Sequence, residues 1–205
     1  MKMGDQILEE FSPEKAEIIG LLCAEGSYYN SFTDCWLYYP NRDKSYFRKN
    51  KQTTYIQFAN FDINLLNHFK NLVYEVYNYN ASFSSDRIRI CNRNVIKDLL
   101  KYTDYGHLKW KVPVNVLKGD NDVKIRFIRG FFDGEGTTST TVRMFSTNER
   151  GLRNISLLLE QLNIKNTFNG PCYKEGRKPY FYIYIRKCDE NKFLSMINPV
   201  SKIRQ

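Results

Sequence analysis

The pattern of apolar and polar residues along this chain has two periodicities, one typical of helices and one typical of strands. Helical periodicity predicts helices over residues 62–74, 94–102, 149–162 and 189–197. Strict alternation predicts strands over residues 54–58, 87–91, 141–145 and 180–186. In each half of the chain the order is helix, strand, strand, helix, strands, helix. This pattern indicates an α+β fold made of two similar units.

A nine-residue segment occurs once in each half. Residues 18–26 read IIGLLCAEG and residues 128–136 read IRGFFDGEG, so the second copy begins just over half the chain length after the first. Each segment is expected to form the C-terminal part of a helix. Ser12 and Pro13 suit the start of the first helix, and the second is expected to begin near Asn121 or Asp122. The expected ends are Glu25 and Glu135, with Gly26 and Gly136 as left-handed stops.

Small residues recur four apart in both helices, at Gly20 and Ala24 and at Gly130 and Gly134. Residues at this spacing share one face, and small side chains there allow two backbones to approach closely. If the two helices pack through these faces, Glu25 and Glu135 lie close together at one end of the interface. Paired carboxylates repel each other unless a hard divalent cation neutralises them.

The two nonapeptides resemble the motif of the LAGLIDADG homing endonucleases, and the order of elements is similar to that of the single-chain, two-motif members. The resemblance implies two αββαββα repeats with the motif helices at their interface. It also implies a saddle of two antiparallel sheets over double-stranded DNA. The chain has a break near residues 115–121. We therefore expect an N-terminal half over residues 1–117 and a C-terminal half over residues 118–205.

The resemblance also implies a catalytic centre. The eighth motif position carries the catalytic acid of the family, which falls on Glu25 and Glu135. These acids and the backbone carbonyls of Ala24 and Gly134 would bind Mg²⁺, with Mn²⁺ or Ca²⁺ as other occupants. A basic residue late in each repeat would act beside each metal. Lys111 is preferred over Lys109 in the first half, and Lys202 is the candidate in the second.

Outward positions of the predicted strands carry basic, amide or phenolic side chains, which contact phosphates and base edges in DNA complexes. The inward positions are apolar, for example Ile56, Ile88, Met144 and Ile183. Between its motif and its second strand the first half has about two dozen extra residues, which include residues 39–51. Aromatic residues interleave with cations there, which favours a loop that contacts duplex DNA. The expected DNA contacts are Arg42, Lys44, Arg48, Lys49, Lys51, Tyr55, Gln57, Arg87, Arg89, Thr138, Thr140, Arg143, Tyr182, Tyr184 and Arg186. A solvated hairpin tip and an ordinary half-exposed sheet are the alternative interpretations.

Composition supports an anionic partner and limits the chemistry. The chain of 205 residues has 31 Lys and Arg against 22 Asp and Glu, a formal net charge of +9. An anionic membrane surface is the second choice of partner, but the cations follow sheet periodicity rather than one helix face. The five cysteines form no CxxC pair and are expected to be reduced thiols. With only two histidines, carboxylates and lysines must carry any catalysis.

These features predict a site-specific, divalent-metal-dependent endonuclease that hydrolyses one phosphodiester in each strand of a long, imperfectly palindromic DNA target. We expect a monomer that requires no protein partner and no membrane. An intracellular location is expected, in the cytoplasm, the nucleoid or an organelle matrix, because no signal peptide is evident. The alternative is an RNA-binding intron maturase or a non-cleaving DNA-binding regulator on the same fold. An acid at the same motif position in both halves of the chain favours the enzyme over these alternatives. The target sequence stays open, as does an intron, intein or free-standing origin.

Overall fold

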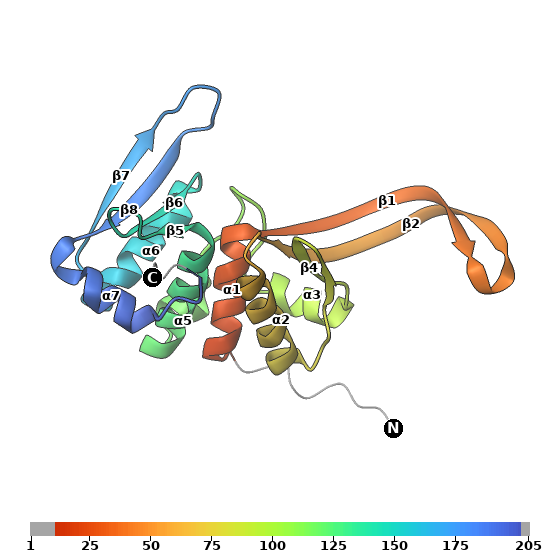
Figure 1. Ribbon diagram of the computed structural model, residues 1–205, viewed down its shortest axis with the longest axis horizontal. Coiled ribbons are helices and arrows are strands. Elements are labelled where there is room, and N and C mark those ends of the chain that lie inside the picture. Colours follow the sequence, from red (N-terminus) through yellow and green to blue (C-terminus); the bar gives the residue numbers. More distant parts are fainter. Residues whose placement is uncertain (1–10, 202–205) are drawn as a thin grey trace.

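The computed structural model describes residues 11–201 and contains two consecutive repeats with the same order of elements (Figure 1). The first repeat consists of α1 (Pro13–Glu25), β1 (Gly26–Tyr39), β2 (Lys44–Ala59), α2 (Ile63–Tyr77), β3 (Ser82–Ser84), β4 (Arg87–Ile90) and α3 (Arg93–Leu100). The second consists of α5 (Asn121–Glu135), β5 (Gly136–Thr137), β6 (Arg143–Ser146), α6 (Glu149–Gln161), β7 (Asn166–Cys172), β8 (Tyr180–Ile185) and α7 (Glu190–Ile197). The αββαββα order expected for each half is confirmed.

Each repeat forms one four-stranded antiparallel sheet, with the strand orders β1-β2-β4-β3 and β5-β6-β8-β7. The two orders are equivalent, so the repeat in the sequence is also a repeat in topology. In Figure 1, α1 and α5 lie side by side at the centre, the hairpin β1–β2 extends to the right, and the hairpin β7–β8 stands on the left and points upward. The short helix α4 (Val114–Lys118) lies between the repeats. The expected division after residue 117 falls within α4 and stays a prediction.

The motif helices begin and end where expected, but the backbone after their last residues differs from the prediction. Ser12 Oγ accepts a hydrogen bond from Lys15 N at 3.2 Å, and α5 is capped by Asp120. The expectation of left-handed stops is wrong, because Gly26 and Gly136 have φ values of −88° and −87°. At both glycines the chain passes directly from helix into strand. A Cβ on Gly26 would overlap the Leu22 carbonyl oxygen, so this turn needs glycine for space rather than for left-handed backbone.

The predicted alternation of the strands is confirmed by their burial. Inward side chains of both sheets are nearly or fully buried, whereas their neighbours along each strand are partly exposed. The buried strand residues are Ile56, Phe58, Ile88, Ile90, Met144, Phe181, Ile183 and Ile185. Arg186 is exposed and lies one residue beyond the end of β8, so its assignment to that strand is corrected. The five cysteines are free thiols, as expected.

The insertion predicted in the first half is a long two-stranded hairpin rather than a loop. β1 has 14 residues and β2 has 16, whereas their counterparts β5 and β6 have 2 and 4. A strand rises about 3.3 Å per residue, so β1 reaches roughly 45 Å from the end of α1. In Figure 1 the hairpin extends far beyond the rest of the first repeat. The β1–β2 hairpin of the first repeat can therefore contact a partner much farther from the motif helices than the short strands β5 and β6 can.

An ion-pair cluster within the protein links the two repeats. The Glu17 carboxylate is fully buried on α1 and faces two arginines of α5 and the His68 imidazole of α2. Arg126 Nη1 lies 2.7 Å from Glu17 Oε2, and Arg129 Nε lies 3.4 Å from Oε1. His68 Nε2 is 2.5 Å from the same Oε1. The partners of Glu17 are far away in the chain, so the spacing of charges in the sequence does not reveal this cluster. In residues 11–201 no helix is long and apolar enough to cross a membrane.

Candidate active site and nucleic-acid interface

The motif helices cross at their glycines, in two equivalent contacts related by the repeat. A Cβ built on Gly20 would overlap Phe127 O, and one on Gly130 would overlap Glu17 O. Glu17 and Phe127 are separated along the chain by the same interval as the two glycines. Backbone thus touches backbone at both crossings. The close approach expected from the small residues is present, and no side chain larger than hydrogen fits there without displacing a helix.

Gly130→Ala is expected to lower the free energy of unfolding by about 3 kcal/mol, because overfilling a close-packed contact forces the backbone to move. Urea denaturation of the purified variant measures this loss. Gly176→Ala is the matched control, since a Cβ built there would have nothing within 4 Å. The control is expected to cost only about 1 kcal/mol for its left-handed backbone. Equal losses in the two variants would contradict the proposed helix contact.

The C-terminal ends of the two motif helices meet, and this places the two acids at one junction. A Cβ on Gly134 would overlap Ala24 Cβ and lie 3.2 Å from Glu25 Cγ. Glu25 and Glu135 are the last residues of α1 and α5. Glu25 is exposed and Glu135 is partly exposed, so solvent reaches both carboxylates. The arrangement expected from the sequence, with both acids at one end of a tight helix pair, is the one the structure has.

A cavity of about 570 Å³ opens beside this junction, and Ala24 of the first repeat and Glu135 of the second both line it. Its cationic and imidazole groups come from two loops. Lys174, Arg177 and Lys178 lie in the β7–β8 turn, and His107 lies in the segment after α3. Lys178 Nζ is 2.9 Å from His107 Nε2, so the loops meet across the repeats. Sequence reasoning did not find these residues, since only the fold brings them to Glu135.

The groups at the junction suit a hard divalent cation. Carboxylate and backbone carbonyl oxygens are the ligands that Mg²⁺ and Ca²⁺ prefer, and Ala24 with Glu135 offers one such pair on a single cavity wall. Across residues 11–201 no cluster of three His, Cys, Asp or Glu side chains is arranged to hold a metal. The protein alone thus offers few ligands. The remaining coordination positions would go to water and to phosphate oxygens of a bound nucleic acid.

The lysines predicted beside the metals are not placed at the cavity by the structure. Lys111 is exposed and does not line the cavity, and its backbone N–H donates to Thr103 Oγ1 at 2.8 Å. Lys109 is also exposed. Lys202 lies outside the described residues. Sequence spacing put these lysines after the last helix of each repeat, but it could not determine the direction of the loops. Their catalytic role stays a prediction.

Asp133 and Cys23 occupy the same motif position but make different contacts. Asp133 Oδ1 accepts hydrogen bonds from Val200 N at 2.9 Å and Ser201 N at 3.1 Å. Burial raises the pKa of this carboxyl, and the two N–H groups oppose the rise. Asp133 therefore attaches the segment around residue 200 to α5. Burial also raises the pKa of the Cys23 thiol, which packs in the hydrophobic core.

The outward face of the first sheet combines arginines with aromatic rings. Gln57 pairs with Arg89 in the β2–β4 register, and the Arg89 guanidinium lies 4.9 Å from the centre of the Tyr55 ring. Tyr55 stacks on Tyr29 of β1 with ring centres 4.9 Å apart. Gln57 Oε1 and Arg89 Nε have no hydrogen-bond partner within the described part of the protein. These two atoms are buried within the face, whereas the Gln57 and Arg89 side chains as a whole are partly exposed on it.

The second sheet has an equivalent face. Arg143 of β6 pairs with Tyr184 of β8, and its guanidinium lies 5.4 Å from the centre of the Tyr182 ring. Arg143 Nε likewise has no hydrogen-bond partner among residues 11–201. Thr138 and Thr140 lie in the turn between β5 and β6. The structure thus brings the candidate residues of each sheet onto one face. It places Arg42, Lys44, Arg48, Lys49 and Lys51 separately, on the distal part of the long hairpin.

The fold of this chain, with paired motif helices and two four-stranded sheets, is similar to that of LAGLIDADG proteins of known structure. Residues 122–198 match the family described as the LAGLIDADG-like domain, so the resemblance inferred from the nonapeptides is confirmed. The solved structure of I-DmoI in complex with DNA and Mn is similar to this chain. It shares 18% sequence identity with a TM-score of 0.63, covering 90% of this chain and 96% of that one. I-DmoI is described as a homing endonuclease. At this identity the likeness shows the fold alone.

The same fold also matches a protein described as DUF199/WhiA. Its N-terminal LAGLIDADG domain shares 15% identity with a TM-score of 0.54, covering 93% of this chain and 87% of that one. The full-length protein from Thermatoga maritima shares 14% identity with the same TM-score, covering 95% of this chain and 59% of that one. No curated protein sequence matches this chain. The fold therefore occurs in proteins with different descriptions, and function must be argued from the site.

Proposed function

We propose that this protein is a site-specific, divalent-metal-dependent endonuclease that cuts both strands of a DNA duplex. The observation that carries the proposal is the meeting of Glu25 and Glu135 at the junction of the motif helices. There a Cβ on Gly134 would lie within 3.2 Å of Glu25 Cγ. Each acid sits where a helix ends and a polar sheet face begins. Two acids at one junction suit two cuts, one in each strand of a single bound duplex.

Glu25, Glu135 and the carbonyls of Ala24 and Gly134 would hold the cations in this proposal. Mg²⁺ bound there supplies a water of lowered pKa and stabilises charge on the attacking and leaving oxygens. The structurally similar I-DmoI was solved in complex with DNA and Mn and, in another structure, with DNA and Ca, which supports divalent ions as the metals of the proposed site. Lys174, Arg177 and Lys178 face the same cavity as Glu135. We assign them the role of balancing the phosphate charge next to that acid.

The outward sheet faces would hold the duplex. Guanidinium groups such as Arg89 and Arg143 bind phosphates or guanine edges, and Gln57 suits an adenine edge. Because the repeats differ in sequence and in hairpin length, the two half-sites of the target should differ. The chain already contains both repeats, so a monomer provides both acids. A stable dimer in sedimentation would argue against this assignment.

A second candidate is a protein that binds nucleic acid on this fold without cutting it, as an intron maturase or a regulator would. The likeness to the LAGLIDADG domain of WhiA is the observation that favours it, since that description names no nuclease. This alternative needs the polar sheet faces but neither acid. The presence of both glutamates at the helix junction supports the enzyme.

The proposed activity is tested by incubating the full chain with a library of long random duplexes in Mg²⁺ and sequencing the newly formed ends. We expect a single family of cut sequences, absent when the metal is chelated. Cutting should require the duplex and leave ends in both strands at a fixed offset. The Glu25→Gln, Glu135→Gln double variant is the matched control. If the parent protein yields no Mg²⁺-dependent ends while still binding duplex DNA, the non-cleaving alternative is correct.

A further inference from the structure

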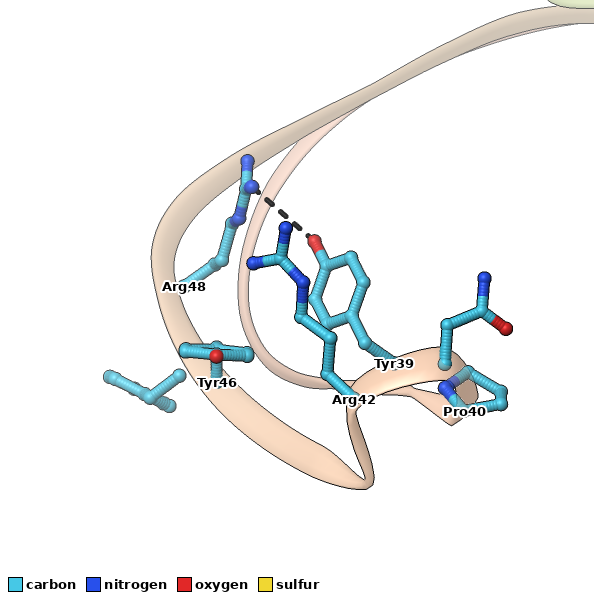
Figure 2. A pocket seen from close by; sticks show the side chains of 7 residues that line it. Tyr39, Pro40, Arg42, Tyr46 and Arg48 are labelled. Carbon is cyan, nitrogen blue, oxygen red and sulfur yellow. Dashed lines mark hydrogen bonds between the residues drawn. The ribbon is translucent and has the colours of Figure 1, made fainter.

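The tip of the long hairpin carries a pocket far from the motif helices. It is lined by Tyr39, Pro40, Asn41, Arg42, Tyr46, Phe47 and Arg48, with a volume of about 650 Å³. In Figure 2, Arg42 and Arg48 lie beside the Tyr39 ring inside the bend of the chain, and Tyr46 lies on the same inner side. Ligand sites for single small molecules commonly have volumes of about 300–1,000 Å³, so this pocket has room for one nucleotide.

The strand register explains why these groups converge. Lys44, Tyr46 and Arg48 pair with Tyr39, Leu37 and Cys35, so alternate residues of both strands share one face. Arg48 Nη2 lies 3.4 Å from Tyr39 Oη, and the Tyr39 and Tyr46 rings pack edge to face with centres 5.5 Å apart. A register shift between Thr33 and Cys35 separates this tip from the stem of the hairpin. Such a bulge bends a strand, so the tip forms a unit distinct from the sheet face.

Charge complementarity identifies the chemical class of the ligand. Between residues 34 and 51 five cations stand against Asp34 and Asp43. Both acids are already engaged, since Asp34 Oδ1 accepts from Asn50 N and Asp43 Oδ1 accepts from Tyr38 Oη, each at 2.8 Å. The guanidinium groups of Arg42 and Arg48 thus suit a phosphate. The exposed rings of Tyr39 and Tyr46 suit a planar base.

We propose that the hairpin tip binds one unpaired nucleotide of a single strand, with its phosphate on Arg42 and Arg48 and its base against Tyr46. A paired base offers only its edge to a protein, whereas an unpaired base offers its face to an aromatic ring. The site is separate from the sheet faces and independent of cleavage. It refines the expectation that residues 42–51 contact duplex DNA. Single-stranded DNA and RNA share this chemistry, and the test distinguishes them.

The test measures fluorescence anisotropy of labelled oligo-dT, oligo-U and a duplex closed at both ends by ethylene glycol linkers, which leave no unpaired base, each with the full protein. Tyr46→Ala is expected to weaken single-strand binding about tenfold, and Tyr46→Phe, which keeps the ring, less than about twofold. Binding of the closed duplex should not change in either variant. Tyr173→Ala is the matched control, because this tyrosine is 78% exposed in the β7–β8 turn of the other repeat.

A reciprocal variant completes the design. Arg89→Ala should weaken the closed duplex and leave the single strands unaffected, because Arg89 lies on the sheet face. Binding of oligo-dT alone or of oligo-U alone would support the site and would identify its ligand as single-stranded DNA or as RNA. The proposal is overturned if neither single strand binds, if Tyr46→Ala binds them as the parent does, or if that variant weakens the duplex equally. These outcomes do not depend on nuclease activity, so the proposed function stands or fails separately.

Discussion

Glu25→Gln and Glu135→Gln are each expected to keep DNA binding and to lose cleavage of one strand or of both. Glutamine has the shape of glutamate but lacks the negative charge that holds a divalent cation. Removing one preorganised electrostatic group from an active site commonly slows the reaction by about 100-fold or more. Binding should be unchanged or slightly tighter, because a negative charge near the phosphates is removed. Both acids end a helix at the same junction, so both substitutions should act on chemistry rather than folding.

The measurement uses a supercoiled plasmid carrying the target found in the library, with Mg²⁺, and follows nicked and linear products separately. Nicking by a single variant would show that each acid serves one strand, and strand-resolved sequencing would show which. Glu160→Gln is the matched control, since Glu160 is an exposed glutamate on α6. It should cut as the parent does. If both active-site variants also produce linear DNA at the parental rate, the assignment of these acids is wrong.

The central part of the site could be predicted from the sequence because it depends on local spacing. Small residues four apart define a face, and the recurrence of the nonapeptide half a chain later defines which faces meet. The structure shows the consequence, with Gly20 against Phe127 and Gly130 against Glu17. The local error concerned the terminal glycines. A helix that continues directly into a strand selects glycine because there is no room for a side chain beside its last turn. A left-handed helix stop also selects glycine, so the sequence does not distinguish the two kinds of helix end.

The surroundings of the site could not be predicted, because they depend on where loops travel. The residues Lys174 to Lys178 lie about forty positions beyond Glu135, and only the β7–β8 pairing carries them back to its cavity. Lys111 was chosen by spacing alone, and spacing does not determine the path of the loop that carries it. The length of the β1–β2 hairpin could not be predicted from the sequence either. Its tip is solvated on both faces, so burial imposes no regular alternation on the sequence.

The buried ion pairs are the clearest case of structure that spacing does not reveal. Lys15 lies in the first turn of α1, where a lysine would ordinarily be solvated, yet it is 1% exposed. Its partner Asp98 is on α3, more than eighty residues away. The apolar face of α3 predicted the helix, but nothing in that pattern indicates an inward carboxylate. Lys15 attaches the N-terminal part of α1 to α3 of the same repeat, and Glu17 attaches it to α5 of the other repeat.

Asp98→Ala is expected to lower the free energy of unfolding by about 4 kcal/mol, because it leaves the Lys15 ammonium buried without its partner. Lys15 Nζ lies 3.0 Å from Asp98 Oδ2, with both side chains at most 2% exposed. Tyr77 Oη donates to the same oxygen at 2.9 Å, so this hydroxyl also loses its acceptor. Urea denaturation measures the change. A loss below about 1 kcal/mol would show that the pair is not desolvated in solution.

Two variants separate burial from charge at this position. Lys101 Nζ also reaches Asp98, at 3.3 Å, but its side chain is 60% exposed. Lys101→Ala should therefore change the free energy of unfolding by no more than about 0.5 kcal/mol. The double variant Lys15→Met, Asp98→Leu removes both charges and should recover most of the stability lost in Asp98→Ala, since an apolar pair of similar volume has no desolvation cost. Recovery would assign the loss to the unpaired ammonium. A double variant as unstable as Asp98→Ala would instead assign it to the Tyr77 contact and to packing around α3.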